Sequence, residues 1–249
     1  MTETPILSAR GLIKDFRKFR AVHDVSFDLA PGESLGIIGP NGSGKTTLVN
    51  LITGFVRPTR GQVLFQGRSI TGLAPHRVAQ LGLARTFQMA RPYLRLPAFQ
   101  NAVVPLFSSR LKKLPGGSYG GREAVALDLL EEVGFERDSL VPFKPASSLP
   151  HGYLKRLELA RCLALRPELI ILDEIFSGLS LAEIAGLVPI IQNLQDQGVS
   201  LIMVEHRLRE LFRVVGRVMV MNFGRCIASG EPARVMSDPL VREAYLGSE

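Results

Sequence analysis

Cysteine and tryptophan are scarce in this sequence of 249 residues, which has two cysteines and no tryptophan. Cys162 and Cys226 fit neither a disulfide framework nor a metal-binding pattern, so we expect two reduced, buried thiols. Apolar runs are short, and none approaches the roughly 18 residues that a membrane-spanning helix needs. The first residues lack the basic and apolar regions of a secretory signal peptide. We therefore expect neither a signal peptide nor a segment that crosses a bilayer.

Acidic residues are absent from positions 34–122, where 12 Lys and Arg occur. The whole chain has 30 Lys and Arg against 23 Asp and Glu, so the rest of it carries 18 bases and 23 acids. A basic segment of this kind predicts a polyanionic partner, such as nucleotide phosphates, nucleic acid or an anionic membrane surface. The alternative is that acidic residues distant in the sequence lie beside these bases in the folded chain.

Short strands and helices alternate along most of the chain. Strands are expected over 7–13, 22–29, 34–38, 63–65, 169–172, 199–204, 217–222 and 225–228, and helices over 45–55, 98–107, 122–133, 181–197 and 207–215. The helices between about 92 and 150 are split by a Gly-rich loop at 115–121, which indicates a helical lobe inserted into a core. Continuous apolar strands such as 169–172 are typical of a parallel sheet covered on both faces. The pattern predicts an α/β fold with ligand sites at the carboxyl ends of strands.

A glycine-rich segment, Gly39-Pro-Asn-Gly-Ser-Gly-Lys-Thr46, matches the pattern G-x-x-x-x-G-K-[ST] and lies between an apolar strand and a helix. Its glycines let successive backbone N–H groups face phosphate oxygens, and the amino end of the following helix adds partial positive charge. Lys45 would reach the β- and γ-phosphates, and Thr46 would offer its hydroxyl to Mg²⁺. The segment therefore predicts a phosphate loop that binds a nucleoside triphosphate.

The apolar run Leu169-Ile-Ile-Leu172 ends in two acidic residues, Asp173 and Glu174. At the end of a parallel strand they would emerge at the edge of the sheet where the phosphate loop lies. Asp173 is placed to hold Mg²⁺ through water. Glu174 can orient and deprotonate an attacking water, as hydrolysis of a γ-phosphate requires. Together with the phosphate loop, these two acids predict nucleotide hydrolysis.

Two further polar residues follow apolar runs. His206 comes after Leu201-Ile-Met-Val-Glu205, where it could touch the same phosphate, and a helix cap or a surface position is the alternative. Gln88 follows Leu83-Ala-Arg-Thr-Phe87, and a neutral amide at a strand end is generic. Neither residue is diagnostic by itself, so both depend on the wider pattern.

In order and rough spacing, these motifs resemble those of the ATP-binding subunits of ABC transporters over nearly the whole chain. Besides the phosphate loop, the segments that carry the resemblance are Gln88, Leu149-Pro-His-Gly-Tyr-Leu-Lys-Arg-Leu-Glu-Leu-Ala-Arg161, Asp173-Glu174, Ser177-Gly-Leu-Ser180 and His206. Within that family the chain looks most like the subunits of branched-chain amino acid importers. The matching segments are Ile38 to Thr46, Leu51-Ile-Thr-Gly-Phe55, Ala84-Arg-Thr-Phe-Gln88, Val204-Glu-His206 and Ala244-Tyr-Leu-Gly247.

The resemblance implies one ABC ATP-binding domain over 1–249, with ATP and Mg²⁺ as cofactors. Its P-loop NTPase core, with a mainly parallel sheet and an N-terminal antiparallel β portion, would be 1–91 and 156–249, and its inserted α-helical subdomain 92–155. Phe16 would stack on adenine, unless it is an ordinary strand aromatic. The other ATP-binding residues would be Gly39, Asn41, Gly42, Ser43, Gly44, Lys45, Thr46 and Thr47. Mg²⁺ would be held by Thr46, Gln88 and Asp173, and the catalytic residues would be Glu174, His206, Lys45 and Gln88.

The resemblance also implies two subunits, because segment 149–153 would close over ATP held by a second copy, with Gly152 pointing at its γ-phosphate. Here the chain departs from the family's Leu-Ser-Gly-Gly-Gln, since it has Leu-Pro-His-Gly-Tyr. Pro150 offers phosphate neither a hydroxyl nor an N–H. Ile175 replaces the family's Pro after Asp-Glu, and Ser180 replaces a later Asp. These two changes bear on loop rigidity and on communication between the two sites.

We therefore expect an active ATPase that energises a membrane transporter, with import of branched-chain or related amino acids or small amides as the main hypothesis. Expected partners are a second ATP-binding subunit (the same or a paralogous chain), transmembrane permease subunits and, indirectly, a periplasmic substrate-binding protein. No direct nucleic acid contact is expected. The expected location is peripheral, on the cytoplasmic side of the bacterial inner membrane.

Part of the basic segment would face the membrane partner. Some of Arg91, Arg95 and Arg110 are expected on that docking face or near anionic lipid. Three alternatives stay open: an ATPase of another ABC transporter such as a lipopolysaccharide exporter, a soluble ABC ATPase associated with nucleic acid, and a P-loop kinase.

Overall fold

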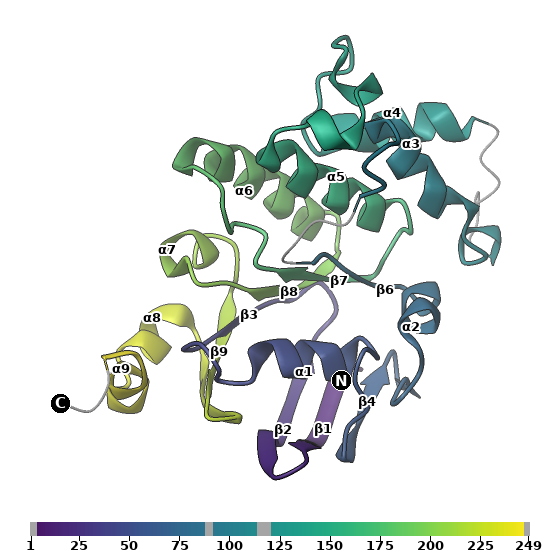
Figure 1. Ribbon diagram of the computed structural model, residues 1–249. Helices are drawn as coiled ribbons and strands as arrows, with labels where there is room; N and C mark the ends of the chain where they lie inside the picture. Colours follow the sequence, from purple (N-terminus) through teal and green to yellow (C-terminus); the bar gives the residue numbers. More distant parts are fainter. Residues whose placement is uncertain (1–3, 88–91, 114–120, 247–249) are drawn as a thin grey trace.

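Two β-sheets and their covering helices make up this computed structural model, which describes residues 4–87, 92–113 and 121–246 (Figure 1). The strands are β1 (Leu7–Phe16), β2 (Phe19–Leu29), β3 (Ser34–Ile38), β4 (Arg60–Phe65), β5 (Arg68–Ser69), β6 (Leu83–Arg85), β7 (Leu169–Asp173), β8 (Ser200–Val204), β9 (Arg217–Asn222) and β10 (Arg225–Gly230). The α-helices are α1 (Lys45–Ile52), α2 (Pro75–Leu81), α3 (Ala98–Val103), α4 (Arg122–Glu132), α5 (His151–Leu163), α6 (Leu181–Asp196), α7 (Leu208–Leu211), α8 (Pro232–Met236) and α9 (Pro239–Leu246). Short 3₁₀-helices lie at Val104–Phe107, Leu111–Lys113, Val141–Phe143 and Ala146–Ser148.

The larger sheet has the strand order β10-β9-β3-β8-β7-β6, and its strands are parallel except for β10 at one edge. The carboxyl ends of β3, β6, β7 and β8 therefore meet at one edge of this sheet. The phosphate loop follows β3, Asp173 ends β7, and Glu205 and His206 follow β8. Segments that are distant in the sequence are brought to one place in this way, as the apolar strands predict.

The parallel strands bury both faces and so separate two cores. On β7, Ile170 and Leu172 pack into a core with α5 and α6, whereas Leu169 and Ile171 pack into a second core with α1. Every residue of β7 is buried, which explains why its sequence is a continuous apolar run rather than an alternating one. Helix α1 lies between the larger sheet and the β1–β2–β4 strands below it (Figure 1). The phosphate loop that precedes α1 is thus supported from both layers.

The smaller sheet is the expected N-terminal antiparallel portion, with the order β2-β1-β4-β5. Leu7 pairs with Leu29 of β2 on one side and with Phe65 of β4 on the other. All three side chains are buried against α1 in the second core. This packing fixes the sheet beneath the helix that follows the phosphate loop.

The expected helices end early in the structure, by one residue at 133 and 197 and by three at 55, and two of them are much shorter. The helix expected over 98–107 is α-helical only to Val103 and continues as a 3₁₀-helix, because Pro105 lacks the N–H that an α-helical turn requires. The helix expected over 207–215 is confined to α7, after which the amides of Val214 and Val215 both donate to the carbonyl of Leu211 in irregular turns. The division of the chain at 92 and 155 stays a prediction.

Acidic residues from outside the basic segment neutralise two of its arginines. Arg85 pairs with Asp173 at 2.7 Å, and Arg110 pairs with Glu168 at 2.6 Å. Arg110 is buried and also donates to the carbonyl of Leu165 at 2.9 Å, so it is not among the arginines that could lie on a docking face. Its guanidinium holds the end of α5 to the start of β7 instead. Arg95 is exposed.

The two cysteines have different environments. Cys162 is buried and Cys226 is exposed, so the expectation of two buried thiols is wrong for the second. Cys226 lies on β10, an edge strand whose residues are only partly covered. Gln88, Arg91 and most of the Gly-rich loop at 115–121 lie outside the described residues. Among the described residues, no helix combines the length and the apolar character that crossing a bilayer requires.

Candidate nucleotide-binding site

The phosphate loop depends on glycines at two positions where a side chain cannot fit. Gly39 has a φ of +145°, and a Cβ there would lie 2.0 Å from the carbonyl oxygen of Met221. Gly44 has a φ of +102°, and its Cβ would lie 2.6 Å from the carbonyl oxygen of Ala21. Both φ values lie in the region that L-residues avoid. Because the loop is packed against β9 and β2, its backbone N–H groups are held at the start of α1.

Lys45 is the first residue of α1, and its ammonium turns back over the loop. Its Nζ donates to the carbonyl oxygens of Gly39 at 2.8 Å and of Pro40 at 3.0 Å. Burial lowers the pKa of Lys45, and the negative charges of Glu174 and Asp173 oppose this shift. The ammonium is thus held at the loop, beside two carboxylates.

A cavity of about 310 Å³, which we call the P-loop cavity, collects residues from four segments of the chain. Its lining residues are Phe19, Ala21, Asn41, Gly42, Ser43, Gly44, Lys45, Thr46, Thr47, Glu174 and His206. Most of the residues that the sequence marks for ATP binding therefore lie around one space. The Glu174 carboxylate and the His206 imidazole, which complete the lining, follow the ends of β7 and β8.

Phe19 is an aromatic lining residue that the sequence did not single out. It is 65% exposed, starts β2 and pairs in register with Phe16 at the end of β1. Phe16, which the sequence suggested for adenine, is half exposed with the Lys14 ammonium 4.8 Å from its ring centre, and it does not line the P-loop cavity. No local sequence signal marks Phe19, because its place at the cavity follows from the pairing of β1 with β2.

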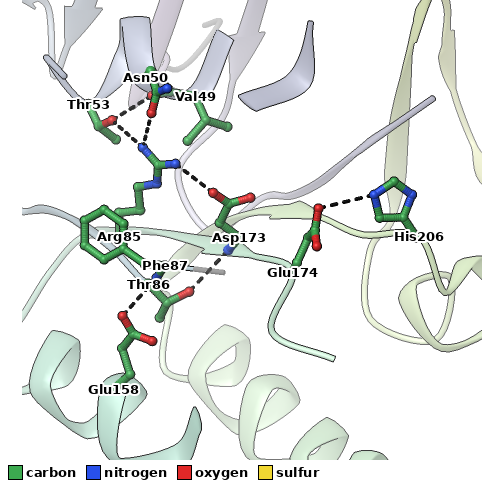
Figure 2. A network of polar contacts seen from close by, with 10 residues as sticks. All are labelled: Val49, Asn50, Thr53, Arg85, Thr86, Phe87, Glu158, Asp173, Glu174 and His206. Carbon is green, nitrogen blue, oxygen red and sulfur yellow. Dashed lines mark hydrogen bonds and ion pairs between the residues drawn. The ribbon is translucent and has the colours of Figure 1, made fainter. Parts of the chain in front are cut away.

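The side chains of Glu174 and His206 face each other (Figure 2), and both line the P-loop cavity. The His206 Nε2 and Glu174 Oε1 atoms lie 3.2 Å apart. The Glu174 backbone has a φ of +51°, and its N–H donates to the carbonyl of Val204 at 2.8 Å. A carboxylate and an imidazole in contact can position a water and exchange its proton. The pair therefore has the geometry expected for activating water beside a phosphate.

Asp173 lies deeper, at the last position of β7, and is held by Arg85 of β6 (Figure 2). One carboxylate oxygen, Oδ2, accepts from Arg85 at 2.7 Å. The same guanidinium donates to Asn50 Oδ1 at 2.6 Å and lies 3.2 Å from Thr53 Oγ1, both near the end of α1. The Asp173 side chain is therefore fixed relative to the helix that begins at the phosphate loop.

The residues around the P-loop cavity fit a magnesium ion bound together with phosphate. Thr46 supplies a hydroxyl at the start of α1, and Asp173, which does not itself line the cavity, supplies a carboxylate at the end of β7. Among the described residues no group of three or more His, Cys, Asp or Glu could hold a metal by itself. Mg²⁺ commonly binds through one or two protein oxygens plus substrate phosphates, so this sparse donor set suits it.

Gly152 does not line the P-loop cavity of its own chain. It is the second residue of α5, and a Cβ there would lie 2.4 Å from Glu183 Oε1, so the start of α5 is packed closely against α6. Gln88 lies outside the described residues. The structure thus brings together the phosphate loop, Glu174 and His206, with Asp173 beneath them, and leaves Gly152 outside this cavity, buried where α5 packs against α6.

Comparisons with known proteins agree with this architecture. The ABC transporter family matches residues 22–177, and the branched-chain amino acid ATP-binding cassette transporter family matches residues 225–249. The chain is 34% identical over 256 residues to the high-affinity branched-chain amino acid transport ATP-binding protein LivG of Escherichia coli (strain K12), with 98% of both chains covered. It is 32% identical over 246 residues to the lipopolysaccharide export system ATP-binding protein LptB of Acidithiobacillus ferridurans, again with 98% of both covered.

A solved structure shares the whole fold. It is the ADP conformation of an ATP-binding cassette of an ABC transporter, with a TM-score of 0.85 and 31% identity over 99% of this chain and all of that one. A family match over more than half of the residues and full-length relatives above 30% identity agree with the phosphate loop and its facing acids. The chain therefore belongs to the ATP-binding cassettes of ABC transporters, a family that hydrolyses ATP.

Proposed function

We propose that this chain binds Mg-ATP in the P-loop cavity and that its ATPase activity drives import of branched-chain or related amino acids or small amides. The convergence of Lys45, Glu174 and His206 on one cavity at the phosphate loop carries the proposal. Support for the substrate class comes from the family match at residues 225–249 and from the likeness to LivG. An amino acid importer is therefore the function that these observations favour.

The residues of the P-loop cavity would divide the chemistry of hydrolysis. Backbone N–H groups of the loop and the Lys45 ammonium bind the β- and γ-phosphates once Lys45 leaves the carbonyls of Gly39 and Pro40. Thr46 and Asp173 hold Mg²⁺, which when bound supplies positive charge to the phosphate oxygens. Glu174 orients a water and accepts its proton.

His206 has a separate part in this chemistry. Its ring contacts the Glu174 carboxylate at 3.2 Å and lines the same cavity, so it is placed to hold that carboxylate and to reach the γ-phosphate. Gln88 is proposed to contact Mg²⁺ and the γ-phosphate, and Phe16 to stack on adenine; Phe19, which lines the cavity, is the second aromatic candidate for adenine.

A second subunit, either the same chain or a paralogue, is proposed to complete the site. Gly152 lies away from the P-loop cavity of its own chain, which agrees with a role at the nucleotide of another copy. Helix α5 begins at His151, whose Nε2 lies 3.3 Å from the carbonyl of Ser177, so the segment that departs from the family pattern has a defined structure. Its proline at 150 still removes one donor from that contact.

Transmembrane permease subunits are proposed to dock in an apolar groove of about 320 Å³, which we call the lobe groove. It lies between α2 and β6 on one side and Pro105 and α5 on the other, and Phe55 and Phe87 are part of its wall. The two rings pack edge to face, with centres 5.5 Å apart. Docking there would place the chain at the cytoplasmic face of the inner membrane, with a periplasmic binding protein acting only through the permease.

Lipopolysaccharide export is the second candidate function, because LptB is similar over the full length at nearly the same identity as LivG. The two candidates differ in the transmembrane partner rather than in the ATPase site. Membership of the ABC family removes the P-loop kinase interpretation.

Purification of the tagged chain with native membranes tests the proposed function. We expect permease subunits and a periplasmic amino acid-binding protein to co-purify. Recovery of lipopolysaccharide export components instead would show that the chain belongs to the exporter. The Glu174→Gln variant should retain Mg-ATP without turnover, and Lys45→Ala should lose both retention and turnover. Normal turnover in Glu174→Gln would refute the assignment of Glu174, and unchanged ATP retention in Lys45→Ala would refute the phosphate site.

A further inference from the structure

Glu174 sits in a backbone conformation that its neighbours must maintain. Its φ of +51° is in the left-handed region, which a residue with a side chain adopts only at a free-energy cost. Both of its backbone polar groups are engaged. The N–H donates to the carbonyl of Val204, and the carbonyl accepts from the N–H of Ser177 at 3.1 Å and from Lys155 Nζ at 3.1 Å. A side-chain ammonium therefore takes part in fixing the residue that faces His206.

Lys155 is buried, although lysine is ordinarily a surface residue. It belongs to α5, and only 2% of it is exposed. Burial lowers the pKa of its ammonium, and four carboxylates oppose this shift, those of Glu158, Glu205, Glu174 and Asp173. A buried ammonium is tolerated only where hydrogen bonds and opposite charges compensate it. Lys155 and these four carboxylates form a polar cluster beneath the P-loop cavity.

Glu205 is one of the buried acids of this cluster, and it holds together the two segments beside Glu174. Its Oε1 accepts from the N–H of Phe176 at 2.8 Å. Phe176 lies two residues after Glu174, and His206 follows Glu205 directly. A single carboxylate therefore joins the segment after β7 to the segment after β8, one residue before His206.

We propose that Lys155 and Glu205 are positioning residues that hold Glu174 and His206 in register for hydrolysis. Lys155 fixes the carbonyl of Glu174, and Glu205, directly before His206, fixes the N–H of Phe176 two residues after Glu174; the two facing side chains lie 3.2 Å apart. The role rests on the proposed function, because it needs Glu174 to act on water. Lys155 also ties Glu174 to α5, the helix whose start is proposed to meet the nucleotide of the second subunit.

In the proposed dimer, this connection would join the start of α5 to Glu174. Lys155 lies one helical turn after the start of α5, so a displacement of that start moves the ammonium that holds Glu174. Ser180, which replaces the aspartate of the family pattern, is engaged in a capping box with Glu183 at the start of α6.

Steady-state ATPase kinetics of the full-length chain test the proposal. Lys155→Met keeps the length of the side chain and removes the donor, so kcat should fall about ten- to a hundredfold, as small displacements of catalytic groups cause. The KM for ATP should stay within about twofold, because the phosphate loop is unchanged. Lys155→Gln restores a neutral N–H donor and should recover part of kcat. Glu205→Met should lower kcat with the same unchanged KM, and Glu205→Gln, which keeps an acceptor oxygen, should be milder.

Arg156→Met is the matched control on the next position of α5. Arg156 donates to the carbonyl of Gly134 at 3.0 Å, within the helical lobe and away from Glu174. It should change Tm without lowering kcat. The proposal is overturned by an unchanged kcat in Lys155→Met, by an equal loss in Arg156→Met, or by a KM that rises in step with the loss of kcat. If Lys155→Met does not fold, the Lys155→Gln and Glu205 variants decide by the same criteria.

The same measurements separate this proposal from the proposed function. A wild-type chain that neither retains nor hydrolyses Mg-ATP would overturn both. A wild-type chain with normal turnover, together with a fully active Lys155→Met, would overturn only the positioning role.

Discussion

Arg85 and Asp173 form a buried ion pair of 2.7 Å between the ends of two neighbouring strands, with 7% and 5% of the two side chains exposed. The Arg85 guanidinium also lies over the rings of Phe55 and Phe87, 5.5 and 5.1 Å from their centres. One end of Arg85 therefore contacts the proposed magnesium ligand, and its flat face contacts the wall of the lobe groove. A molecule bound in that groove would therefore be separated from Asp173 by the Arg85 side chain.

Removal of Arg85 should destabilise the chain strongly. Arg85→Met leaves the Asp173 carboxylate buried without its counter-ion, which costs about 3–5 kcal/mol in the free energy of unfolding. Asp173→Asn in the same chain removes the uncompensated charge, so the double variant should lose less than Arg85→Met alone. Urea denaturation of Arg85→Met and of the double variant measures these free energies of unfolding. Arg95→Met, at an exposed position, should stay within about 0.5 kcal/mol of wild type. A double variant less stable than Arg85→Met would contradict the pairing.

The sequence predicts the edge of the sheet where the site forms, because local rules determine it. A phosphate loop between strand and helix and an apolar run ending in Asp173 and Glu174 each specify a strand end. Because parallel strands end at the same edge of a sheet, the phosphate loop and the two acids can be placed together without knowing any long-range contact. The same reasoning places His206, since it follows a third buried strand. The assignments of Gln88 and Gly152 to a nucleotide stay predictions.

The polar cluster beneath the site could not be predicted, because it depends on pairing between distant residues. Arg85 reads as one more base in a segment without acids, and its partner lies 88 residues later. Lys155 reads as a solvated helical lysine, and Glu205 as a neighbour of His206 without a function of its own. Cys226 reads as a buried thiol, since no local pattern shows that β10 is an edge strand. Such burial is decided by the order of strands in the sheet.

Glu205 should make stability depend on pH in a defined direction. Burial raises the pKa of Glu205 from 4.5 to about 7, with the negative charge of Glu174 adding to this and the backbone N–H groups and Lys155 opposing it. The folded state therefore binds the proton more tightly than the unfolded state. Its stabilising contribution is fully present below about pH 4.5 and is lost as pH rises through about 7. Glu205→Gln lacks this loss, so its stability relative to wild type should improve by up to about 3 kcal/mol between pH 5 and pH 8.5.

Thermal unfolding of both proteins across this pH range measures the effect. Glu243→Gln, an exposed position on α9, serves as the control and should follow wild type at every pH. A constant difference in stability between wild type and Glu205→Gln would show that Glu205 titrates alike in the folded and unfolded chain.

Thiol reactivity should distinguish the two cysteines. Cys226 is exposed on the edge strand and should react with an aromatic disulfide reagent in the folded protein. Cys162 is buried, and burial raises its pKa to about 12, so its thiol should react only after unfolding. We expect one thiol to react in native buffer and two in guanidinium chloride. Cys226→Ser should abolish the native reaction, and two reactive thiols in the folded protein would contradict the placement of Cys162.

Docking of the membrane partner in the lobe groove should depend on Phe55, which is 49% exposed and lines it. Loss of a central aromatic contact commonly costs about 2 kcal/mol of binding, or more than tenfold in affinity. Phe55→Ala should therefore reduce the amount of permease that co-purifies with the tagged chain, while the purified subunit still retains Mg-ATP. Leu140→Ala removes an apolar side chain that is 77% exposed outside the groove and should leave capture unchanged. Equal capture by the two variants would place the permease elsewhere on the surface.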